Sequence, residues 1–480
     1  MTINVFAVFF GMGLTSASAQ NVVNLTGTTR TQINAVANTI YDGGGRAVID
    51  GSDPLAPSRR CRSQADCLGV ANWRSLYRVE VPSTAAWSDG LFQNGRLMSL
   101  ASSTGLTGFD FDDTARFTAV LAADREDFAR GIIHLTAPQI SQGEPVVAAW
   151  SRPNVIRYAL ATIDGNEIRF TPPEGFEPYP VPAYTNRYQV LNSPNDIVQP
   201  GQYAISGRDG VAVYMPLQGV TNRLSIGSRR IGFLINAPGV TIRGIKFINF
   251  ASRPGDTRQG TPIYAQKENL TVENSRFLQM QLLAGNGVIS HPFARELRIQ
   301  NNIVSNILGG SGFRISGRGP VYVEKNRIDN IGRTGIYFQS VLKGLIRCNN
   351  LSEINGIHGN GITAYIDNRE VDIVGNTVVS SLRPMTLEGI GRKEPVYPAD
   401  PATKIQIWGN TLETPTARGV AAIISWGGFS LETPSIWLGP NRFIGNGLQT
   451  RIATGVSTVF SPQDPKLNLI DENAPFYNCN

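Results

Sequence analysis

The sequence predicts an all-β protein organised around a parallel β-helix, a solenoid whose coils stack short strands into long sheets. The first observation is a recurring phrase, apolar-x-x-Asn-x-apolar, with its asparagine at positions 302, 326, 349, 376, 410 and 441. Ser275 takes the same slot in an earlier phrase, and successive slots lie 27, 24, 23, 27, 34 and 31 residues apart. Repeats of this length indicate stacked supersecondary units. The second observation is that each repeat holds β-rich runs without helical period, so one repeat is one coil.

The recurring asparagine has two mechanical explanations. A tight corner between strands requires a residue that tolerates a left-handed backbone, which Asn does better than most. Its amide can also bond to the Asn of the coils above and below. Both explanations predict that these residues hold the fold together, which makes them poor catalytic candidates.

Size and composition allow more than one domain. The chain has 480 residues, 41% of them apolar, and 50 glycines suited to many turns. Four cysteines do not form a disulfide scaffold in so long a chain. Cys61 and Cys67 lie close enough to close a small loop in an oxidising compartment. Cys348 is expected to be a small core residue rather than a reactive thiol, and Cys479 is unplaced.

The first nineteen residues resemble a signal peptide. They carry no charge, are mostly apolar from Val5 to Leu14, and end Ala17-Ser18-Ala19, a small-x-small cleavage site. The basic residues that usually precede the apolar core are missing. No later run is long enough to span a membrane. We therefore expect residues 1–19 to be removed and the mature protein to be exported, to the periplasm or outside the cell.

The net charge of +6 favours an acidic partner. Nucleic acid is not expected, because the chain has no basic cluster and no nucleic-acid-binding motif and carries an export signal. An acidic polysaccharide fits better.

The pattern divides the chain into parts. Residues 20–72 are expected to form an N-terminal cap and first coil, with a short amphipathic helix over 32–40 covering the open end of the solenoid. Residues 73–223 lack the repeat and alternate as antiparallel strands, with hairpin turns at Asp164-Gly165 and Asp209-Gly210. Residues 224–447 carry the repeat, and residues 448–480 form a tail.

The antiparallel part resembles a known module. The segment Gly90–Leu97 is similar to the hairpin of the β-barrel or β-sandwich module inserted in many right-handed β-helix glycoside hydrolases. The likeness continues at Arg187–Asn192, Pro200–Tyr203 and Gly210–Pro216, although those relatives usually read Pro-Gly-Glu-Trp where this chain reads Pro-Gly-Gln-Tyr. The resemblance implies a right-handed, pectate-lyase-like solenoid with an inserted module and a carbohydrate-active class. The resemblance does not identify the reaction, because the matching motifs belong to the scaffold and not to an active site.

One sheet of the solenoid is expected to carry the site. Its strands begin with Gly followed by an apolar residue, and alternation points every second side chain outward. Arginines suit bidentate capture of a sugar carboxylate, and tyrosines suit stacking on sugar rings. An ordinary solvated sheet is the alternative. The outward set is Tyr264, Gln266, His291, Arg314, Ser316, Arg318, Tyr337, Gln339, Thr363, Tyr365, Asp367, Thr386 and Glu388. We expect substrate binding by His291, Arg314, Arg318, Tyr337, Gln339 and Tyr365.

Asp367 and Glu388 are the two carboxylates of this face in the middle coils. Neighbouring strands lie about 4.8 Å apart, and a two-residue offset gives a separation of roughly 8 Å. That separation is typical of inverting glycosidases, and a slip of register would bring the pair nearer the retaining spacing. We therefore predict that the pair acts as acid and base or nucleophile. The alternative is a salt bridge from one of them to Arg369 or Arg392.

His358 lies in the Gly-rich segment 355–361, which resembles the Gly-His-Gly loop of polygalacturonase-type β-helix enzymes. Their paired Asp motifs have no match here. The resemblance implies that His358 orients a sugar or shares a proton. A hydrogen-bonded structural histidine is the alternative for both His358 and His291.

A polysaccharide lyase is the second reading of the same face. Elimination beside a uronate needs a neutralised carboxylate and a base, which Arg314 or Arg318 with Tyr337, Tyr365 or His358 could supply. A calcium-assisted lyase would also need clustered acids. No zinc pattern, P-loop or dinucleotide motif is present. We expect no cofactor for a hydrolase, with calcium only for a lyase. A third reading is a non-catalytic glycan-binding solenoid.

Overall fold

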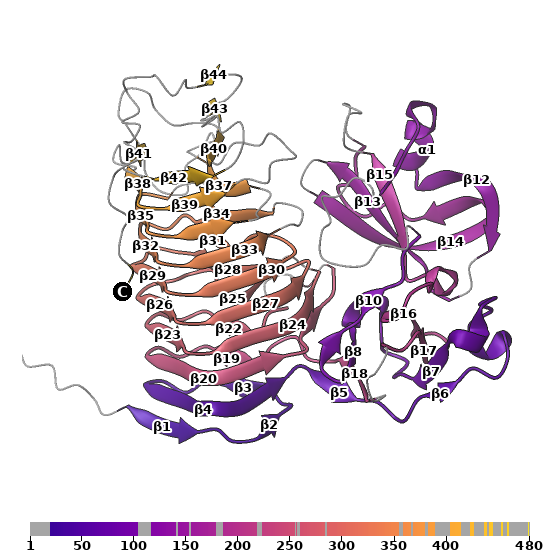
Figure 1. Ribbon diagram of the computed structural model, residues 1–480, viewed down its shortest axis with the longest axis horizontal. Coiled ribbons are helices and arrows are strands. Elements are labelled where there is room, and N and C mark those ends of the chain that lie inside the picture. Colours follow the sequence, from indigo (N-terminus) through magenta and orange to yellow (C-terminus); the bar gives the residue numbers. More distant parts are fainter. Residues whose placement is uncertain are drawn as a thin grey trace, which may run out of the picture.

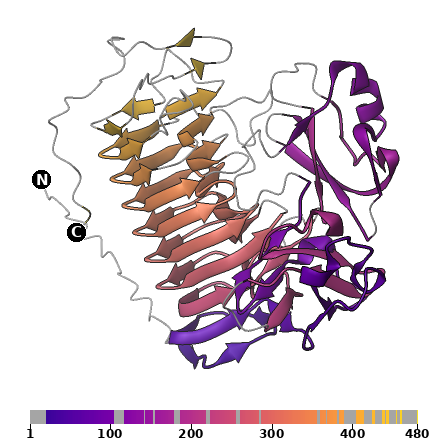
Figure 2. The ribbon, with the colours of Figure 1, turned by 45° about the vertical axis from the view of Figure 1, so that its right-hand side comes forward.

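The protein forms a long stack of β-coils with a separate β module alongside it (Figure 1). The computed structural model describes residues 20–103, 117–140, 143–152, 155–178, 186–217, 223–254, 256, 260–283, 286–354, 359–365, 368–379, 383–388, 404–413, 423–426, 436–438, 441–444, 453–454, 458–459 and 479. The stack is a parallel β-helix, as predicted, and neighbouring coils pair strand on strand (Figure 2).

Each coil contributes three strands, and each set of equivalent strands makes one face. The face that concerns the site is a nine-stranded parallel sheet. Its strands are β3 (Ile33–Asn34), β19 (Phe233–Ile235), β22 (Ile263–Ala265), β25 (Gly287–His291), β28 (Ser311–Ser316), β31 (Ile336–Gln339), β34 (Asn360–Tyr365), β37 (Arg383–Glu388) and β40 (Ile423–Trp426).

The other two faces form one continuous 19-stranded sheet, because the long first strands turn the corner between them. Those strands are β4 (Thr39–Asp50) and β20 (Val240–Ile248), with β1 (Asn21–Asn24), β2 (Thr28–Thr29) and β21 (Ala251–Ser252) beside them. The second face continues with β23 (Leu270–Glu273), β26 (Leu297–Gln300), β29 (Val321–Glu324), β32 (Lys343–Arg347), β35 (Glu370–Val374), β38 (Lys404–Trp408) and β41 (Ile436–Leu438). The third continues with β24 (Arg276–Leu282), β27 (Ile303–Leu308), β30 (Arg327–Ile331), β33 (Asn350–Ile354), β36 (Thr377–Val379), β39 (Thr411–Glu413) and β42 (Arg442–Ile444).

The core fills the inside of the coils with columns of like side chains. Alternation along each strand turns every second residue inward. Ile299, Val323 and Ile346 stack in register on three successive coils, and all three are fully buried. Phe247 and Phe277 stack in the same way, with ring centroids 4.7 Å apart. Burying one such side chain contributes about 1.5–3 kcal/mol, so the repeated columns stabilise the whole stack.

The asparagine ladder is confirmed. Asn326 Nδ2 donates to Asn349 Oδ1 at 2.9 Å, and Asn349 Nδ2 donates to Asn376 Oδ1 at 2.9 Å. The same pattern links Asn302 to Asn326, Asn376 to Asn410, and Asn410 to Asn441. The left-handed explanation is wrong for these residues. The positive φ falls one position earlier, on Asn301, Lys325, Cys348, Gly375 and Gly409.

The predicted helix over residues 32–40 is wrong. This stretch holds β3 and the start of β4, because Ile33 pairs in parallel with Phe233 and Ile40 pairs with Thr241. The cap of the stack is therefore built from strands. Pairing with the next coil outweighs a weak helical pattern, since propensity is only a mild local bias.

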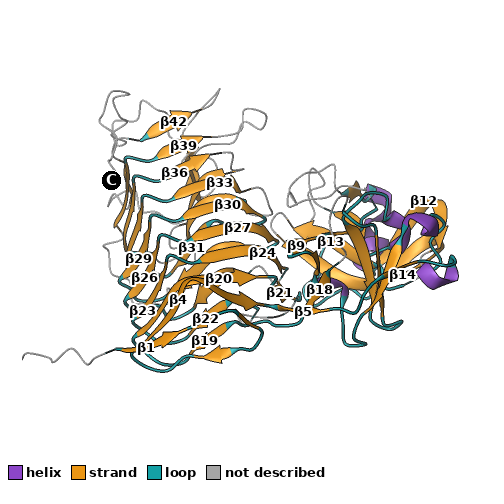
Figure 3. Ribbon diagram, turned by 60° about the horizontal axis from the view of Figure 1, so that its bottom comes forward, coloured by secondary structure: helices purple, strands orange, loops and turns teal. Residues whose placement is uncertain are grey.

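The module lies within residues 52–227 and is mainly antiparallel, with one parallel pair between β10 and β16. The described helices are all in it (Figure 3). They are α1 (Arg125–Ala129) and the short 3-10 turns 65–67, 73–75, 87–89, 122–124 and 194–196. Its strands are β5 (Ser52–Pro54), β6 (Arg59–Arg60), β7 (Tyr77–Glu80), β8 (Leu91–Gln93), β9 (Arg96–Leu97), β10 (Ser99–Leu100), β11 (Thr118–Ala119), β12 (Ile132–Ile140), β13 (Val146–Arg152), β14 (Val155–Phe170), β15 (Arg187–Leu191), β16 (Gln202–Ser206), β17 (Val211–Tyr214) and β18 (Leu224–Gly227).

One of the two predicted hairpin turns is correct. Asp209-Gly210 lies in the turn between the antiparallel strands β16 and β17. Asp164-Gly165 is not a turn, because β14 runs through it and pairs there with the end of β12. Gly165 has φ +58, so it acts as an irregularity inside a long strand.

Two disulfides join the four cysteines. Cys61 pairs with Cys67 in the module. Cys348 pairs with Cys479, a pairing that the sequence left open. At the top of the stack, β43 (Ala453–Thr454) and β44 (Thr458–Val459) pair antiparallel. None of the helices in the described part of the chain has the length and apolar character to cross a membrane.

Candidate functional site

The nine-stranded face carries two columns of outward side chains. The register places Tyr264, Ser290, Arg314, Tyr337, Thr363 and Thr386 in the first column, one per coil. Two residues further along, Ser316, Gln339 and Tyr365 form the second. Between them run the fully buried inward residues Ile315, Phe338 and Ala364. Strand alternation thus brings most of the predicted outward side chains to one surface.

Tyr337 lies against Arg314 of the coil before it and Tyr365 of the coil after it. The Arg314 guanidinium carbon lies 5.5 Å from the centroid of the Tyr337 ring, which is a cation–π distance. The Tyr337 and Tyr365 rings lie 5.7 Å apart and are tilted by 32°. The Tyr337 hydroxyl donates to Gln339 Oε1 at 3.2 Å. This arrangement presents aromatic faces, a phenol and a cation side by side, a combination that suits a sugar with an anionic substituent.

Two threonine hydroxyls on this face are buried and unpaired. Among the described residues, Thr363 Oγ1 and Thr386 Oγ1 have no hydrogen-bond partner. They are adjacent in register, on β34 and β37. A buried hydroxyl without a partner is uncommon and needs an explanation. A ligand hydroxyl seated on these strands would satisfy both.

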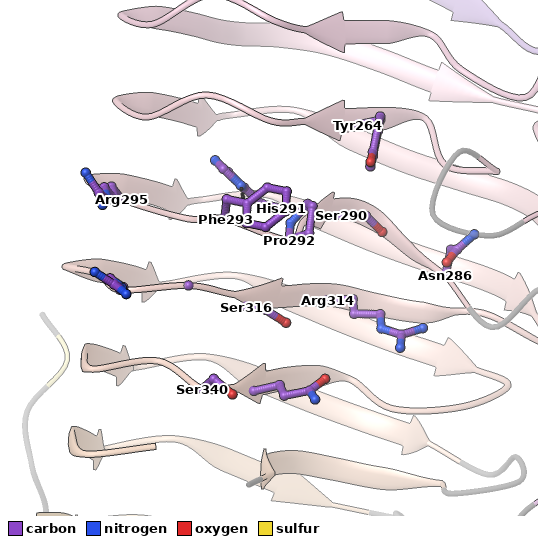
Figure 4. Close-up of a pocket in the computed structure, with 13 residues that line it drawn as sticks. Tyr264, Asn286, Ser290, His291, Pro292, Phe293, Arg295, Arg314, Ser316 and Ser340 are labelled. Carbon is purple, nitrogen blue, oxygen red and sulfur yellow. Dashed lines mark hydrogen bonds between the residues drawn. The ribbon is translucent and has the colours of Figure 1, made fainter. Parts of the chain in front are cut away.

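A pocket of about 560 Å³ opens on the same face and extends over the coils from Tyr264 to Ser340 (Figure 4). Its charged lining residues include Arg295, Arg314 and Arg318, and none of its described lining residues carries a carboxylate. The remaining lining residues are Tyr264, Asn286, Ser290, His291, Pro292, Phe293, Ser316, Gly317, Gln339 and Ser340. The pocket therefore carries positive charge.

The expectation that His291 points outward is wrong. His291 pairs in register with inward Ile315 and is fully buried. Its Nε2 lies 2.8 Å from the carbonyl oxygen of Lys267 and donates to it, while Nδ1 accepts from the amide of Phe293 at 3.3 Å. Burial lowers its pKa to about 4, so the ring is neutral near pH 7. Its edge reaches the pocket wall, where it fixes the turn that follows β25.

Of the remaining predicted site residues, the structure describes Arg318 and Glu388 but not Asp367 and His358. Arg318 is exposed on the turn after β28 and lines the pocket, although it lies outside the strand. Glu388 ends β37, and the backbone pairing of Ala364 with Leu387 brings it level with Tyr365. Asp367 and His358 lie outside the described residues. The acid pair therefore stays a prediction.

Among the pocket residues that sequence reasoning missed are Ser290, Phe293 and Arg295. Phe293 is 60% exposed, which is unusual for so large an apolar side chain. A signal was present, because Pro292, Phe293 and Arg295 follow directly on a strand of the site face. Within the described residues, no group of three or more His, Cys, Asp or Glu side chains could hold a metal ion.

Comparison with known proteins supports the architecture. Residues 262–381 match the family described as "Right handed beta helix region". A solved structure titled "Glycoside hydrolase" aligns with 91% of this chain and 89% of its own at a TM-score of 0.56 and 11% identity. "The complex structure of XylC with xylose" aligns with 88% of this chain and 81% of its own, at a TM-score of 0.34 and 11% identity. No curated protein matched. The chain is thus a right-handed β-helix that shares its fold with the first of these structures.

Proposed function

We propose that this protein is an exported carbohydrate-active enzyme that hydrolyses glycosidic bonds in an acidic polysaccharide. The observation that carries the proposal is the outward surface of the nine-stranded sheet. There Tyr337 contacts both Arg314 and Tyr365, beside two buried, unpaired threonine hydroxyls. Sugars combine apolar ring faces with many hydroxyls, and an acidic sugar adds a carboxylate. This surface offers a partner for each of these groups.

The fold supports the class of activity without deciding it. A structure titled "Glycoside hydrolase" has the same architecture over most of both chains. Because unrelated functions share folds, the residues of the face must carry the assignment.

Asp367 and Glu388 are the proposed acid and base. Glu388 ends the strand level with Tyr365, and Asp367 follows Tyr365 by two residues in the sequence. In hydrolysis one carboxylic acid protonates the leaving oxygen, while the other carboxylate activates water or attacks the sugar. Thr363 and Thr386 would bond sugar hydroxyls beside the reacting centre, with Tyr337 and Tyr365 as stacking surfaces. His358 is proposed to orient the sugar or share a proton.

A lyase is the second candidate, favoured by the contact between Arg314 and Tyr337. A guanidinium that neutralises a uronate carboxylate next to a phenol supplies the two parts needed for proton abstraction and elimination. A calcium-dependent variant would lose activity on chelation, whereas hydrolysis by the carboxylate pair would not.

Export is proposed from the apolar first nineteen residues and is supported by the two disulfides. Disulfides persist in oxidising compartments and are rare in the cytosol.

The test is incubation of the purified protein with a panel of acidic polysaccharides, following ultraviolet absorbance and reducing ends together. New reducing ends without absorbance support hydrolysis, and Asp367→Asn and Glu388→Gln should then each abolish them. Rising absorbance marks an unsaturated uronate and replaces the hydrolase with the lyase. Function that survives both substitutions without any cleavage would assign a glycan-binding solenoid instead.

A further inference from the structure

The corner of the β-helix after β25 and β28 holds a second set of residues suited to a sugar. Phe293 lies on this corner with 60% of its side chain exposed, between Arg295 and Arg314 (Figure 4). Arg318 lines the same pocket from the next coil. An exposed aromatic ring flanked by guanidinium groups can stack on the apolar face of a pyranose while the cations bind its anionic substituent.

The corner is held rigidly. The Ala294 amide donates to the Ser316 carbonyl at 2.7 Å, and the Gly319 amide donates to the Ala294 carbonyl at 3.0 Å. Gly317 permits this approach, because a Cβ there would lie 2.2 Å from the Ala294 nitrogen. From inside the coil, His291 accepts the Phe293 amide and bonds back to Lys267. Because the backbone that carries the ring is held from both sides, little backbone freedom is lost on binding, which favours a ligand site over a chance surface residue.

The charge of Arg295 is available to a ligand. Its guanidinium forms no hydrogen bond or ion pair with any residue that the structure describes. The charged side chains in the described lining of the pocket are arginines, so the pocket attracts an anion.

The corner is remote from the proposed carboxylates. Glu388 lies on β37, and β25 is four strands away in the same sheet. At about 4.8 Å per strand the two are roughly 19 Å apart. One sugar unit of an extended chain is about as long as one coil is high, so a bound chain would place a unit near Phe293 about four units from the cleaved bond.

We propose that Phe293, Arg295 and Arg318 form a distal subsite for an anionic sugar unit, about four units from the cleaved bond. The inference rests on the proposed cleavage by the same face and deepens it, because it requires an extended chain with anionic substituents. The anion can be a carboxylate or a sulfate ester, since a guanidinium pairs with either.

The test measures binding by calorimetry in the Glu388→Gln background. Three probes are used, a hexamer of galacturonate, a sulfated hexasaccharide without carboxylates, and neutral xylohexaose. Arg295→Gln should raise the Kd of an anionic hexamer about tenfold and leave that of xylohexaose unchanged. Phe293→Ala should weaken every hexamer that binds, because stacking does not depend on charge. The stronger of the two anionic probes identifies the anion.

Matched controls are Arg276→Gln, an exposed arginine at the start of β24 on another face, and Leu160→Ala, an exposed apolar residue of the module. Equal effects of Arg295→Gln and Arg276→Gln on anionic probes would overturn the subsite. So would undiminished binding by Phe293→Ala. With active protein, Arg295→Gln should raise KM for a hexamer but not for a trimer, with kcat unchanged. If no probe is cleaved yet Arg295 still governs binding, the cleavage proposal fails and the anion site stands.

Discussion

Asp89 and Arg253 form a two-pronged ion pair where the inserted module meets the β-helix. Arg253 Nε donates to one carboxylate oxygen of Asp89 at 2.9 Å, and a terminal nitrogen donates to the other at 2.8 Å. Arg230 adds a third bond at 2.9 Å, and Asp89 is only 3% exposed. Asp89 ends a short turn of the module, whereas both arginines belong to the first coils. The pair therefore fastens the module to the solenoid.

Removing this carboxylate should loosen the module. Asp89→Ala leaves two arginines without their shared partner, and the loss should be about 3 kcal/mol of unfolding free energy. Denaturant unfolding and limited proteolysis of residues 52–227 measure it. Asp53→Ala, which removes an exposed ion pair with Arg229 nearby, should cost less than about 1 kcal/mol. Equal losses in the two variants would show that burial of Asp89 adds nothing.

His291 should make stability fall in mild acid. Burial lowers its pKa from 6.5 to about 4, so between these values the unfolded chain binds a proton that the folded protein does not. Its contribution is complete above pH 6.5 and declines as the pH falls to 4, by up to about 3 kcal/mol.

The measurement is denaturant unfolding at pH 7, 5.5 and 4 for wild type and His291→Gln. Gln can keep both hydrogen bonds and does not titrate, whereas the carboxylates titrate alike in both proteins. As the pH falls, the free energy of unfolding of the wild type should decrease more than that of His291→Gln. If the difference in free energy of unfolding between the two proteins did not change with pH, His291 would not be a buried neutral imidazole with a lowered pKa.

The middle of the asparagine ladder should be sensitive to substitution. Asn349 Oδ1 accepts from both the amide and the side chain of Asn326, and its Nδ2 donates to Val323 and Asn376. Asn349→Ala leaves these buried partners without a hydrogen bond and should lower the free energy of unfolding by about 3 kcal/mol. Asn330→Ala, which breaks one bond to Asn306 at a half-buried position of β30 with φ +54, should cost less, about 1–2 kcal/mol. Thermal unfolding of the two variants provides the comparison.

Gly317 should tolerate no side chain. It has φ +143, and a Cβ would lie 2.2 Å from the Ala294 nitrogen and 2.5 Å from its oxygen. Gly317→Ala should cost about 2 kcal/mol or more and displace the corner that carries Phe293. Gly45→Ala is the control, since Gly45 has φ +74 but open space around it, and should cost about 1 kcal/mol. Equal costs would mean that the contact with Ala294 is not tight.

The repeat was predictable because a single residue type marks it. Asn302 to Asn441 occupy one position in every coil, so the sequence itself displays the period. The helix over 32–40 was wrong because its pairing partner, Phe233, lies two hundred residues away. The spacing of apolar residues within a short segment contains no information about a strand pairing with so distant a residue. The disulfide between Cys348 and Cys479 is equally remote in sequence.

The sequence predicted which side chains of the nine-stranded sheet point outward, except in a strand where two apolar residues follow each other. In β25 both Val288 and Ile289 follow the glycine, and Ile289 is the one that aligns with Phe313. Aligning Val288 instead shifts the strand by one residue, which exchanges the faces of Ser290 and His291. Phe293 and Arg295 lie beyond the strand, where alternation no longer applies. Their position beside the pocket follows from the hydrogen bonds between two corners.

Ser52 pairs with Gly227 in neighbouring antiparallel strands, so the chain leaves the solenoid for the module and returns at one point. Paired residues of this kind have Cα atoms about 5 Å apart, a gap that a short turn can bridge. The module is therefore a cassette. A single insertion or deletion in the gene could add or remove the module without altering the path of any coil. A different domain whose ends lie close together could be inserted at the same point.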